Sequence, residues 1–224
     1  FIAPVIARAS KLYKRKLKAR HLVQQALDRL TPDVNGYGIA QADIIIEAIF
    51  EDLEVKQTLF KDLEKRAKPE AILATNTSSI PLDDINQVLK QPERLVGIHF
   101  FNPVAMMQLV EVVSGKITSE AITGKAIAFV KQIKKLPLPV KSSPGFLVNR
   151  VLMPYLMESF LLMDEGVSKE AIDCAAKDFG MPMGPIELAD AVGLDVGLSV
   201  ANELIKHFGG VVPQCLKEKV EQGQ

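Results

Sequence analysis

A polar cluster set among apolar, strand-like residues is the part of this sequence best suited to chemistry. His99 ends the apolar run 95–98, and Glu111 lies inside the apolar run 109–113. An imidazole and a carboxylate on apolar elements are each costly to bury alone, so a mutual contact would account for both. Such a pair is a general base with a carboxylate that orients it, provided that the fold brings the two together.

Each of these residues also has a purely structural interpretation. Histidine is often partly buried in protein cores without a catalytic role, and Glu111 could pair with any lysine. The segment Asn76-Thr77-Ser78-Ser79 favours the catalytic alternative, because it adds hydroxyl and amide groups that could bind a ligand. We therefore predict a catalytic cluster that contains His99, Glu111 and Ser78.

The composition is that of an ordinary globular protein and excludes several classes. The chain has 224 residues, of which 48% are hydrophobic, and its 27 basic residues balance 27 acidic ones. This balance gives no support to a nucleic-acid partner or to binding at an anionic membrane. Cys174 and Cys215 match no metal or redox spacing, so we predict no metal site and free thiols in a reducing compartment. No apolar run reaches the roughly 18 residues of a membrane span, and the opening residues lack the pattern of a signal peptide, so we expect neither.

The elements that must position the cluster follow from the periodicity of apolar residues. The sequence predicts one long helix over 4–30, with a basic run inside it. That run could bind an anionic ligand or partner, or it could be a solvated helix face, which is the simpler interpretation. Strands are then expected at 43–49, 71–75, 95–100, 109–113 and 138–140, and helices between them at 55–67, 81–89 and 118–134. This alternation predicts an α/β fold with a sheet of mostly parallel strands.

The pattern changes at residues 141–145, beyond which only helical periodicities remain. Ser143, followed by a proline, is expected to cap the first of these helices, and Ser168 the second. The helices are expected at 146–165, 168–179 and 185–207, the last with a break near Gly193. We therefore predict two domains, 1–141 with the sheet and 142–224 with helices alone.

Four stretches of the chain, in order and with matching separations, resemble the L-3-hydroxyacyl-CoA dehydrogenase family. They are Asn76-Thr77-Ser78-Ser79, Gly97-Ile98-His99-Phe100-Phe101-Asn102-Pro103, Pro144-Gly145-Phe146-Leu147-Val148-Asn149-Arg150 and Met181-Pro182-Met183-Gly184-Pro185. The resemblance runs from about residue 42 to about residue 202. The segment 49–56 is most similar to the bacterial multifunctional fatty-acid oxidation proteins, in which an enoyl-CoA hydratase domain precedes this one.

The resemblance implies an activity and a set of site residues. The implied activity is NAD-dependent oxidation of L-3-hydroxyacyl-CoA to 3-oxoacyl-CoA in fatty-acid β-oxidation. His99 matches the family's catalytic base and Glu111 its partner, while Ser78 and Asn149 match the residues that hydrogen-bond the reacting substrate. The positions that line the nicotinamide-ribose side of NAD are matched by Glu51, Lys56, Ser78 and Asn102.

Two of these assignments have alternatives in the residues themselves. Lys56 lies in the first turn of an expected helix, where a lysine is often solvated. Asn102 precedes a proline and could serve turn chemistry alone, although its position three residues after His99 favours a ligand contact.

The resemblance also implies an architecture and partners. Members of the family join a Rossmann-type dinucleotide-binding domain to a helical domain that supplies most of the dimer contacts. We therefore expect a homodimer formed through residues 142–224, fused in the full protein to an upstream hydratase domain and located in the bacterial cytoplasm.

This chain departs from the family at its start. Members open with a strand, a glycine-rich turn, a helix and a second strand that ends in an acidic residue, and this unit grips the dinucleotide. The chain contains no G-x-G-x-x-G and begins, on the family pattern, just after the second strand. The first domain is therefore expected to be a truncated Rossmann-type domain, and residues 1–224 alone are expected to bind NAD weakly or not at all and to be inactive.

Two other functions stay open. One is a related dehydrogenase that uses the same pair on a hydroxy acid without CoA, and the other is a non-catalytic dimerisation module formed by the helical half. The sequence decides neither the acyl chain length nor the choice between NAD and NADP, because the acidic residue that would decide the latter is not in it.

Overall fold

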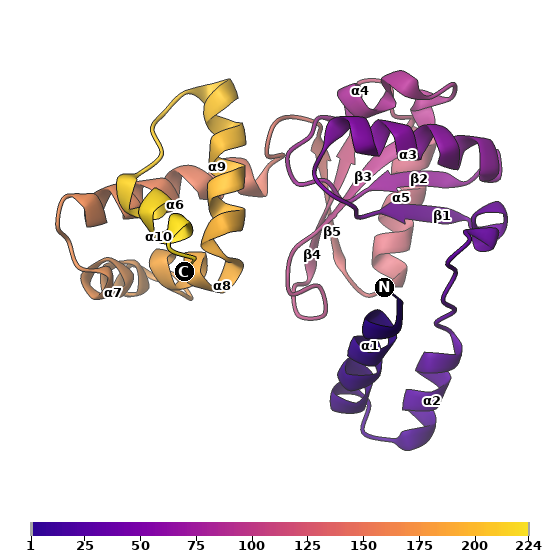
Figure 1. Ribbon diagram of the computed structural model, residues 1–224, viewed down its shortest axis with the longest axis horizontal. Helices are drawn as coiled ribbons and strands as arrows, with labels where there is room; N and C mark the ends of the chain where they lie inside the picture. The colour runs from indigo at the N-terminus through magenta and orange to yellow at the C-terminus, as the bar shows by residue number, and fades with distance from the viewer. Residues whose placement is uncertain (1, 224) are drawn as a thin grey trace.

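The computed structural model describes residues 2–223, which form three structural parts. A sheet with helices on both faces is followed by a bundle of helices, and a pair of helices at the start of the chain projects away from the sheet (Figure 1). The Rossmann-type sheet domain followed by an all-helical part is the fold class that the sequence predicts.

Five strands form one sheet in the order of the chain. They are β1 (Ile44–Glu47), β2 (Ile72–Thr75), β3 (Leu95–Phe100), β4 (Leu109–Ser114) and β5 (Leu136–Lys141). All neighbours are parallel except β3 and β4, which run antiparallel. The central strands are buried because both faces of the sheet are covered, which agrees with their continuous apolar runs.

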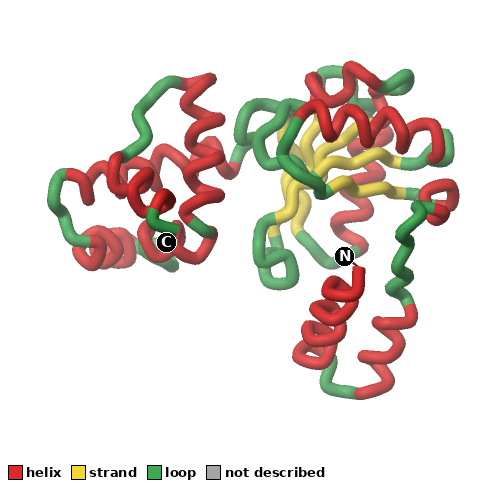
Figure 2. Tube along the Cα trace, in the orientation of Figure 1, coloured by secondary structure: helices red, strands yellow, loops and turns green. Residues whose placement is uncertain are grey.

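Helices cover the sheet on both sides (Figures 1 and 2). The helices α3 (Leu53–Arg66) and α4 (Leu82–Ile85) pack on one face, and α5 (Glu120–Gln132) packs on the other. Alternate strand residues supply the two cores: Leu73, Leu95 and Val113 face α3 and α4, whereas Ile72, Val96 and Val112 face α5. Short 3₁₀ helices at Tyr37–Gln41, Asn86–Val88 and Pro92–Arg94 complete the connections.

The second half contains helices alone. They are α6 (Val148–Asp164), α7 (Lys169–Phe179), α8 (Pro185–Val192), α9 (Leu194–Phe208) and α10 (Gln214–Glu221). The expected break at Gly193 is confirmed, and its φ of 104° is one that glycine adopts without strain. The predicted cap at Ser168 is also confirmed, because its hydroxyl accepts from the amide of Ala171 at 3.3 Å. The last helix, α10, was not predicted.

The predicted cap at Ser143 is wrong. The first helix of this half begins at Val148 and not at Phe146, and Ser143 lies in the turn before it. The turn is needed because the chain must leave β5 and change direction before a helix can start. Gly145 allows this change, with a φ of 70° and a packed environment in which an added Cβ would lie 2.7 Å from Cδ2 of Leu204.

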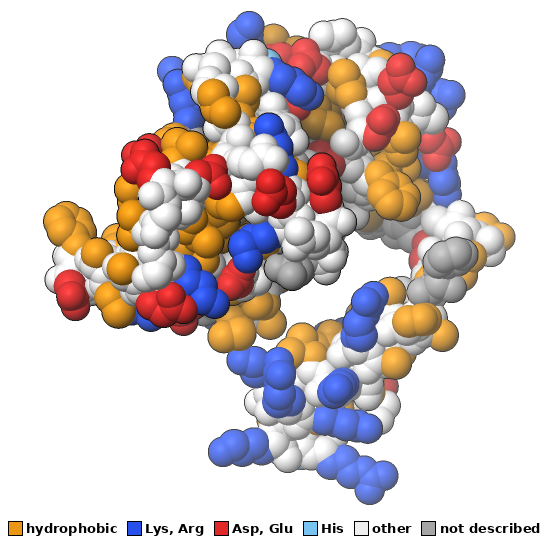
Figure 3. Space-filling model, turned by 60° about the vertical axis from the view of Figure 1, so that its left-hand side comes forward, with side chains coloured by type: hydrophobic (Ala, Val, Ile, Leu, Met, Phe, Trp, Pro, Cys, Tyr) orange, Lys and Arg blue, Asp and Glu red, His pale blue; other side chains and the backbone are white. Residues whose placement is uncertain are grey.

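The prediction of one helix over 4–30 is also wrong. The structure has two helices, α1 (Ile2–Lys16) and α2 (Arg20–Asp28), with Leu17 to Ala19 between them. The two helices contact each other, so folding back covers part of the apolar face of each, which a single long helix would leave in water. The basic side chains of this pair are exposed on the projecting part (Figure 3).

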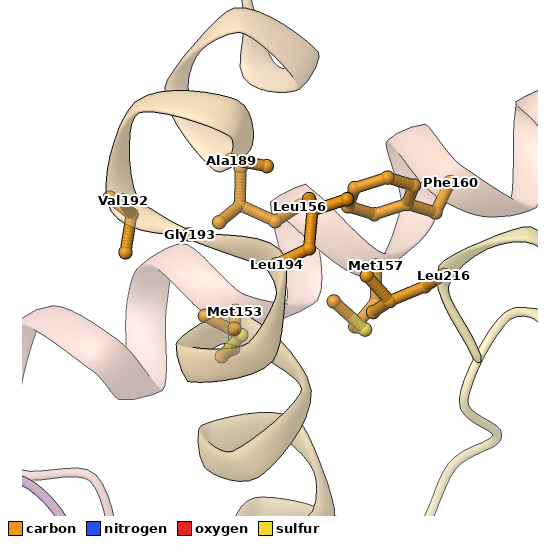
Figure 4. Close-up of a pocket in the computed structure, with 10 residues that line it drawn as sticks. Met153, Leu156, Met157, Phe160, Ala189, Val192, Gly193, Leu194 and Leu216 are labelled. Atoms are coloured by element: carbon orange, nitrogen blue, oxygen red, sulfur yellow. The ribbon is translucent and has the colours of Figure 1, made fainter. Parts of the chain in front are cut away.

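A small cavity lies inside the helical half (Figure 4). Its volume is about 20 Å³, and its walls are apolar side chains and glycines, among them Met153, Phe160 and Leu194. A space of this size and polarity is too small for an organic ligand and is of a kind that stays dry. We therefore regard it as a packing feature of the core.

Candidate active site

His99 and Glu111 are brought together by the register of two strands. The strands β3 and β4 are antiparallel, and this register sets His99 directly opposite Glu111. Opposed residues on one face of an antiparallel pair have neighbouring side chains. Nδ1 of His99 lies 2.7 Å from Oε2 of Glu111, and the two residues are 5% and 0% exposed. The predicted pair therefore forms inside the core.

The contact assigns the protons of the imidazole. A carboxylate can only accept a hydrogen bond, so Nδ1 of His99 must carry a proton and donate the hydrogen bond to Glu111. In neutral imidazole the other nitrogen then has a free lone pair. Among residues 2–223, Nε2 has no hydrogen-bond partner. The geometry thus presents a nitrogen that can accept a proton.

The second oxygen of Glu111 binds the start of the helical half. Oε1 accepts hydrogen bonds from the backbone amides of Leu147 at 3.0 Å and Val148 at 2.9 Å. These amides belong to the first turn of α6, where unpaired N–H groups and the helix dipole favour a negative charge. One carboxylate therefore orients the histidine and caps a helix of the other domain.

Two aromatic rings hold the imidazole from the sides. The ring centroid of Phe101 lies 4.5 Å from that of His99, and Phe146 makes an edge contact at 5.6 Å. Phe146 has a positive φ of 50°, which is unusual for a bulky residue. Its ring is buried and belongs to the core cluster under α3 and α4. The turn before α6 is thus shaped to place an apolar ring against the histidine.

The turn that contains Ser78 is organised by Glu51. Oε1 of Glu51 accepts from the hydroxyl of Thr77 at 2.5 Å and from the amides of Ser78 at 2.8 Å and Ser79 at 3.2 Å. Partial burial alone would raise the pKa of Glu51, but the bonds from Thr77 and Ser78 and the nearby Lys56 outweigh it and hold the pKa below 4.5. Glu51 is therefore ionised at neutral pH and fixes the position of Ser78.

Lys56 is buried, which excludes the solvated alternative. Its exposure is 1%, and its Nζ lies 2.6 Å from Oε1 of Glu47 and 3.2 Å from Oε2 of Glu51. Glu47 was not among the predicted site residues. The signal was present, because Glu47 is a lone carboxylate in the apolar run 43–49, which is the pattern that identified Glu111.

Of the asparagines near the site, Asn149 and Asn76 make hydrogen bonds there, whereas Asn102 is exposed. Asn149 lies in the first turn of α6 and its Nδ2 is 3.5 Å from the carbonyl oxygen of Ser78, so the two predicted substrate residues meet across the domain junction. The carboxamide of Asn76 accepts from the amide of Phe100 at 2.8 Å and ties the ends of β2 and β3 together. Asn102 is exposed beyond the end of β3 and makes no side-chain hydrogen bond within residues 2–223.

Glu51 and the turn 76–79 are suited to contact the nicotinamide-ribose part of a dinucleotide. Glu51 and the turn 76–79 follow the carboxyl ends of β1 and β2, which is where ligands bind to parallel α/β sheets. The side chain of Glu51 is 34% exposed, so a ligand can approach it. These groups could contact a nicotinamide and its ribose. Within residues 2–223 no glycine-rich turn is present that could hold the pyrophosphate.

Two other kinds of site find no support in the part of the chain that the structure describes. No group of three or more His, Cys, Asp or Glu side chains there is arranged to hold a metal ion. None of its helices has both the length and the apolar composition needed to cross a bilayer.

The chain belongs to the 3-hydroxyacyl-CoA dehydrogenase family. Residues 3–143 match the family model of the 3-hydroxyacyl-CoA dehydrogenase NAD-binding domain, and residues 145–224 match that of the 3-hydroxyacyl-CoA dehydrogenase C-terminal domain. The family expected from the four sequence stretches is thereby confirmed. The boundary between residues 141 and 142 stays a prediction.

The chain is similar to curated sequences and to solved structures. The fatty acid oxidation complex subunit alpha of Vibrio vulnificus is 42% identical over 198 residues, which are 88% of this chain but 28% of that protein. The crystal structure of FadB2 from M. tuberculosis is similar with a TM-score of 0.95 and 33% identity, over 100% of this chain and 82% of that one. The (S)-3-hydroxybutyryl-CoA dehydrogenase PaaH1 from Ralstonia eutropha gives 0.89 and 35%, over 99% and 80%.

Proposed function

We propose that this chain contains the catalytic pair and substrate-positioning groups of an NAD-dependent L-3-hydroxyacyl-CoA dehydrogenase that acts in fatty-acid β-oxidation. The observation that carries the proposal is the 2.7 Å contact between His99 and Glu111, with Nε2 of the imidazole left without a partner among residues 2–223. Membership of the family supports the choice of reaction.

The residues suggest how the reaction proceeds. Oxidation of a secondary alcohol removes a proton from oxygen and a hydride from carbon, and NAD supplies the hydride acceptor when it is bound. Nε2 of His99 accepts the proton, and Glu111 stabilises the imidazolium that forms. Ser78 and Asn149 are suited to hold the reacting oxygen in place. General base catalysis of this kind contributes about 10²- to 10⁴-fold in rate.

The same proposal includes the substrate, the residues that contact the cofactor and the longer protein to which the chain belongs. The substrate is a 3-hydroxyacyl group on CoA, and Glu51, Lys56, Ser78 and Asn102 belong to the nicotinamide-ribose side of the cofactor site. The chain spans 28% of the length of its Vibrio vulnificus relative, and that protein is named as a subunit of a fatty acid oxidation complex. This supports a longer, multifunctional protein with an enoyl-CoA hydratase domain upstream, located in the bacterial cytoplasm.

We also propose a homodimer formed through the helical half. Apolar side chains are exposed there on several helices, among them Val151, Phe179, Val196 and Phe208, which are 68%, 90%, 48% and 51% exposed. Exposed apolar surface of this kind often marks a contact with another chain. Sedimentation velocity tests this: a monomer at micromolar concentration would exclude the dimer.

The central experiment compares two histidine variants of the full-length protein. Oxidation of NADH with acetoacetyl-CoA is measured for His99→Gln and for His207→Gln, an exposed histidine near the end of α9. His99→Gln should lower kcat by about 100-fold or more, whereas His207→Gln should leave it unchanged. Unchanged turnover in His99→Gln would refute the proposed chemistry and favour a dimerisation module. Activity on hydroxy acids without CoA would instead favour the related dehydrogenase.

A further inference from the structure

Glu47 is a buried carboxylate that the proposed reaction does not yet use. It is the last residue of β1 and is 3% exposed. Its Oε1 accepts from Nζ of Lys56 at 2.6 Å and from the amide of Ile49 at 2.7 Å, and its Oε2 accepts from the hydroxyl of Thr75 at 2.7 Å. Both oxygens are thus occupied, and the side chain is held by the loop after β1, by β2 and by α3.

A continuous set of contacts leads from Glu47 to the substrate turn. Nζ of Lys56 forms ion pairs with two carboxylates: it lies 2.6 Å from Oε1 of Glu47 and 3.2 Å from Oε2 of Glu51. The other oxygen of Glu51 accepts from the amide of Ser78. Glu47 therefore lies at the buried end of a row of charged groups whose partly exposed end, Glu51, orders the turn that carries Ser78.

We propose that Glu47 is a positioning residue for the dehydrogenase reaction: it holds the ammonium of Lys56, and through it Glu51, at the carboxyl end of β1. This inference rests on the proposed function. Glu47 itself reaches no ligand, because it is fully enclosed by Lys56, Thr75 and the backbone of Ile49.

The charged groups Glu47, Lys56 and Glu51 carry an excess of negative charge. Two carboxylates, Glu47 and Glu51, share the single ammonium of Lys56, so the row carries one net negative charge. Such a charge in a poorly solvated site attracts a cation at the exposed end. The nicotinamide ring is cationic when oxidised and neutral when reduced. Glu47 therefore favours the oxidised cofactor over the reduced one.

A purely structural ion pair would need only one carboxylate for Lys56, whereas this arrangement has two. One carboxylate is enough to neutralise a buried lysine, and buried ion pairs give little net stability in themselves. Here Lys56 is held between two carboxylates, and the second of them is 34% exposed at the ligand-binding edge of the sheet. The excess charge is thus directed to the edge where the cofactor is expected.

The first test asks whether Glu47 holds Lys56, and it needs no cofactor. The full-length protein is treated with formaldehyde and a borohydride reagent in the absence of cofactor, and methylation of Lys56 is followed by peptide mass spectrometry. Lys56 should be protected in the unaltered chain and in Asp173→Ala, a destabilising change in the helical half. Glu47→Gln should speed its methylation by about tenfold or more, since it weakens a buried ion pair. Equal protection of Lys56 in Glu47→Gln would overturn the inference.

A second variant keeps the test decisive if Glu47→Gln does not fold. Thr75→Val removes one hydrogen bond from Glu47 at 2.7 Å and one from the amide of Thr77 at 3.2 Å, while leaving every charge in place. It should speed methylation of Lys56 by about threefold, because one hydrogen bond to a charged group is lost. No change in Lys56 protection in this variant would count against the inference.

The second test measures cofactor preference in the full-length protein. Dissociation constants of NAD⁺ and NADH are obtained by fluorescence titration for Glu47→Gln and Asp173→Ala. Glu47→Gln should raise the ratio of the NAD⁺ constant to the NADH constant by about three- to tenfold, and Asp173→Ala should leave it unchanged. An unchanged ratio in Glu47→Gln would refute the charge argument. If the unaltered protein binds neither form, the proposed function fails, while Lys56 methylation still decides whether Glu47 positions the lysine.

Discussion

Local caps start two of the main helices of the sheet domain, whereas distant side chains cap three helices of the helical half. Each half has an exception: the amide of Leu82 in α4 is bound by the distant Ser142, and α7 is capped by its own Ser168. In the sheet domain, α3 is capped by its own Asp52, whose carboxylate accepts from the amide of Val55 at 2.9 Å, and α5 is capped by its own Ser119. Each cap is a residue type that favours this position, next in sequence to the helix that it starts. These starts can be read from the sequence.

Three helices of the helical half have no such residue and are capped from a distance. Their N-caps are Leu147, Gly184 and Pro213, none of which makes a side-chain capping bond. The amides are instead bound by Glu111 for α6, by Asp173 for α8 and by Asp164 for α10.

The difference shows where the active site depends on tertiary structure. Glu111 comes from β4 and lies 36 residues before Leu147, so the start of α6 depends on docking of the helical half onto the sheet. The same carboxylate orients His99. Domain docking and preparation of the base therefore share one side chain, whereas the caps of α3 and α5 are independent of the site.

The change with the largest expected effect is Glu111→Gln. An amide has one acceptor oxygen, so it cannot both orient His99 and cap α6 as the carboxylate does. Turnover should fall by about 100-fold or more, and the free energy of unfolding should fall by about 3 kcal/mol because buried charged hydrogen bonds are lost. Steady-state kinetics and urea denaturation measure the two effects. Glu203→Gln, which removes the half-buried partner of the exposed Lys206, is the control and should change neither by much.

The next change separates a distant cap from a local one. Asp173→Ala removes the carboxylate that accepts from the amides of Ile186 at 2.8 Å and Glu187 at 3.2 Å. It should lower the free energy of unfolding by about 2 kcal/mol, compared with about 1 kcal/mol for the local cap in Asp52→Ala. Turnover of the folded protein should stay the same in Asp173→Ala. An unchanged urea midpoint in this variant would mean that α8 starts without its distant cap.

The third prediction concerns pH and the cap of α10. Burial would raise the pKa of Asp164, but the nearby side chain of Cys215 and hydrogen bonds from the amides of Cys215 and Gln214 outweigh it and lower the pKa below its ordinary value of 3.8. Because the folded pKa is the lower one, this stabilisation is complete well above the unfolded pKa of 3.8 and is lost as the pH falls through the folded value. The unaltered chain should therefore lose more stability than Asp164→Asn between about pH 5.5 and about pH 3. Urea denaturation at both pH values provides the measurement, and parallel curves would contradict it.

The smallest effect is expected from a glycine of a locally determined helix. Gly124 lies within α5, and an added Cβ there would meet no atom within 4 Å. Gly124→Ala should raise the free energy of unfolding by about 1 kcal/mol, since alanine loses less conformational entropy in a helix. Gly145→Ala is the matched contrast and should destabilise the chain, because its φ is positive and Leu204 is in contact. Thermal unfolding distinguishes the two, and a lower Tm for Gly124→Ala would contradict the prediction.

The sequence was a good guide wherever the signal was local. Apolar runs predicted all five strands, because burial on both faces of a sheet demands such runs. The break at Gly193 and the cap at Ser168 were predicted from single residues. The lone carboxylate in the run 109–113 pointed to a buried partner for the same reason: an unpaired charge in the core is costly.

The sequence was a poor guide wherever a distant contact replaced a local signal. The predicted helix over 4–30 contains no glycine or proline that marks the reversal at residues 17–19, which instead follows from the packing of α1 on α2. Ser143 looked like a helix cap, but the amides of α6 are bound by Glu111. Glu47 had the same local signal as Glu111, a lone carboxylate in an apolar run, but nothing local identified Lys56 as its buried partner.

By itself, then, the sequence determined which elements form and which side chains could do chemistry, since hydrophobic periodicity and the cost of buried charge act within short stretches of chain. Only the tertiary structure decided that β3 and β4 run antiparallel, that their register sets His99 against Glu111, and that the second oxygen of Glu111 binds α6. The physical reason is that these hydrogen bonds join residues 12 to 37 positions apart, and such bonds form only when the sheet and the helical half have packed together.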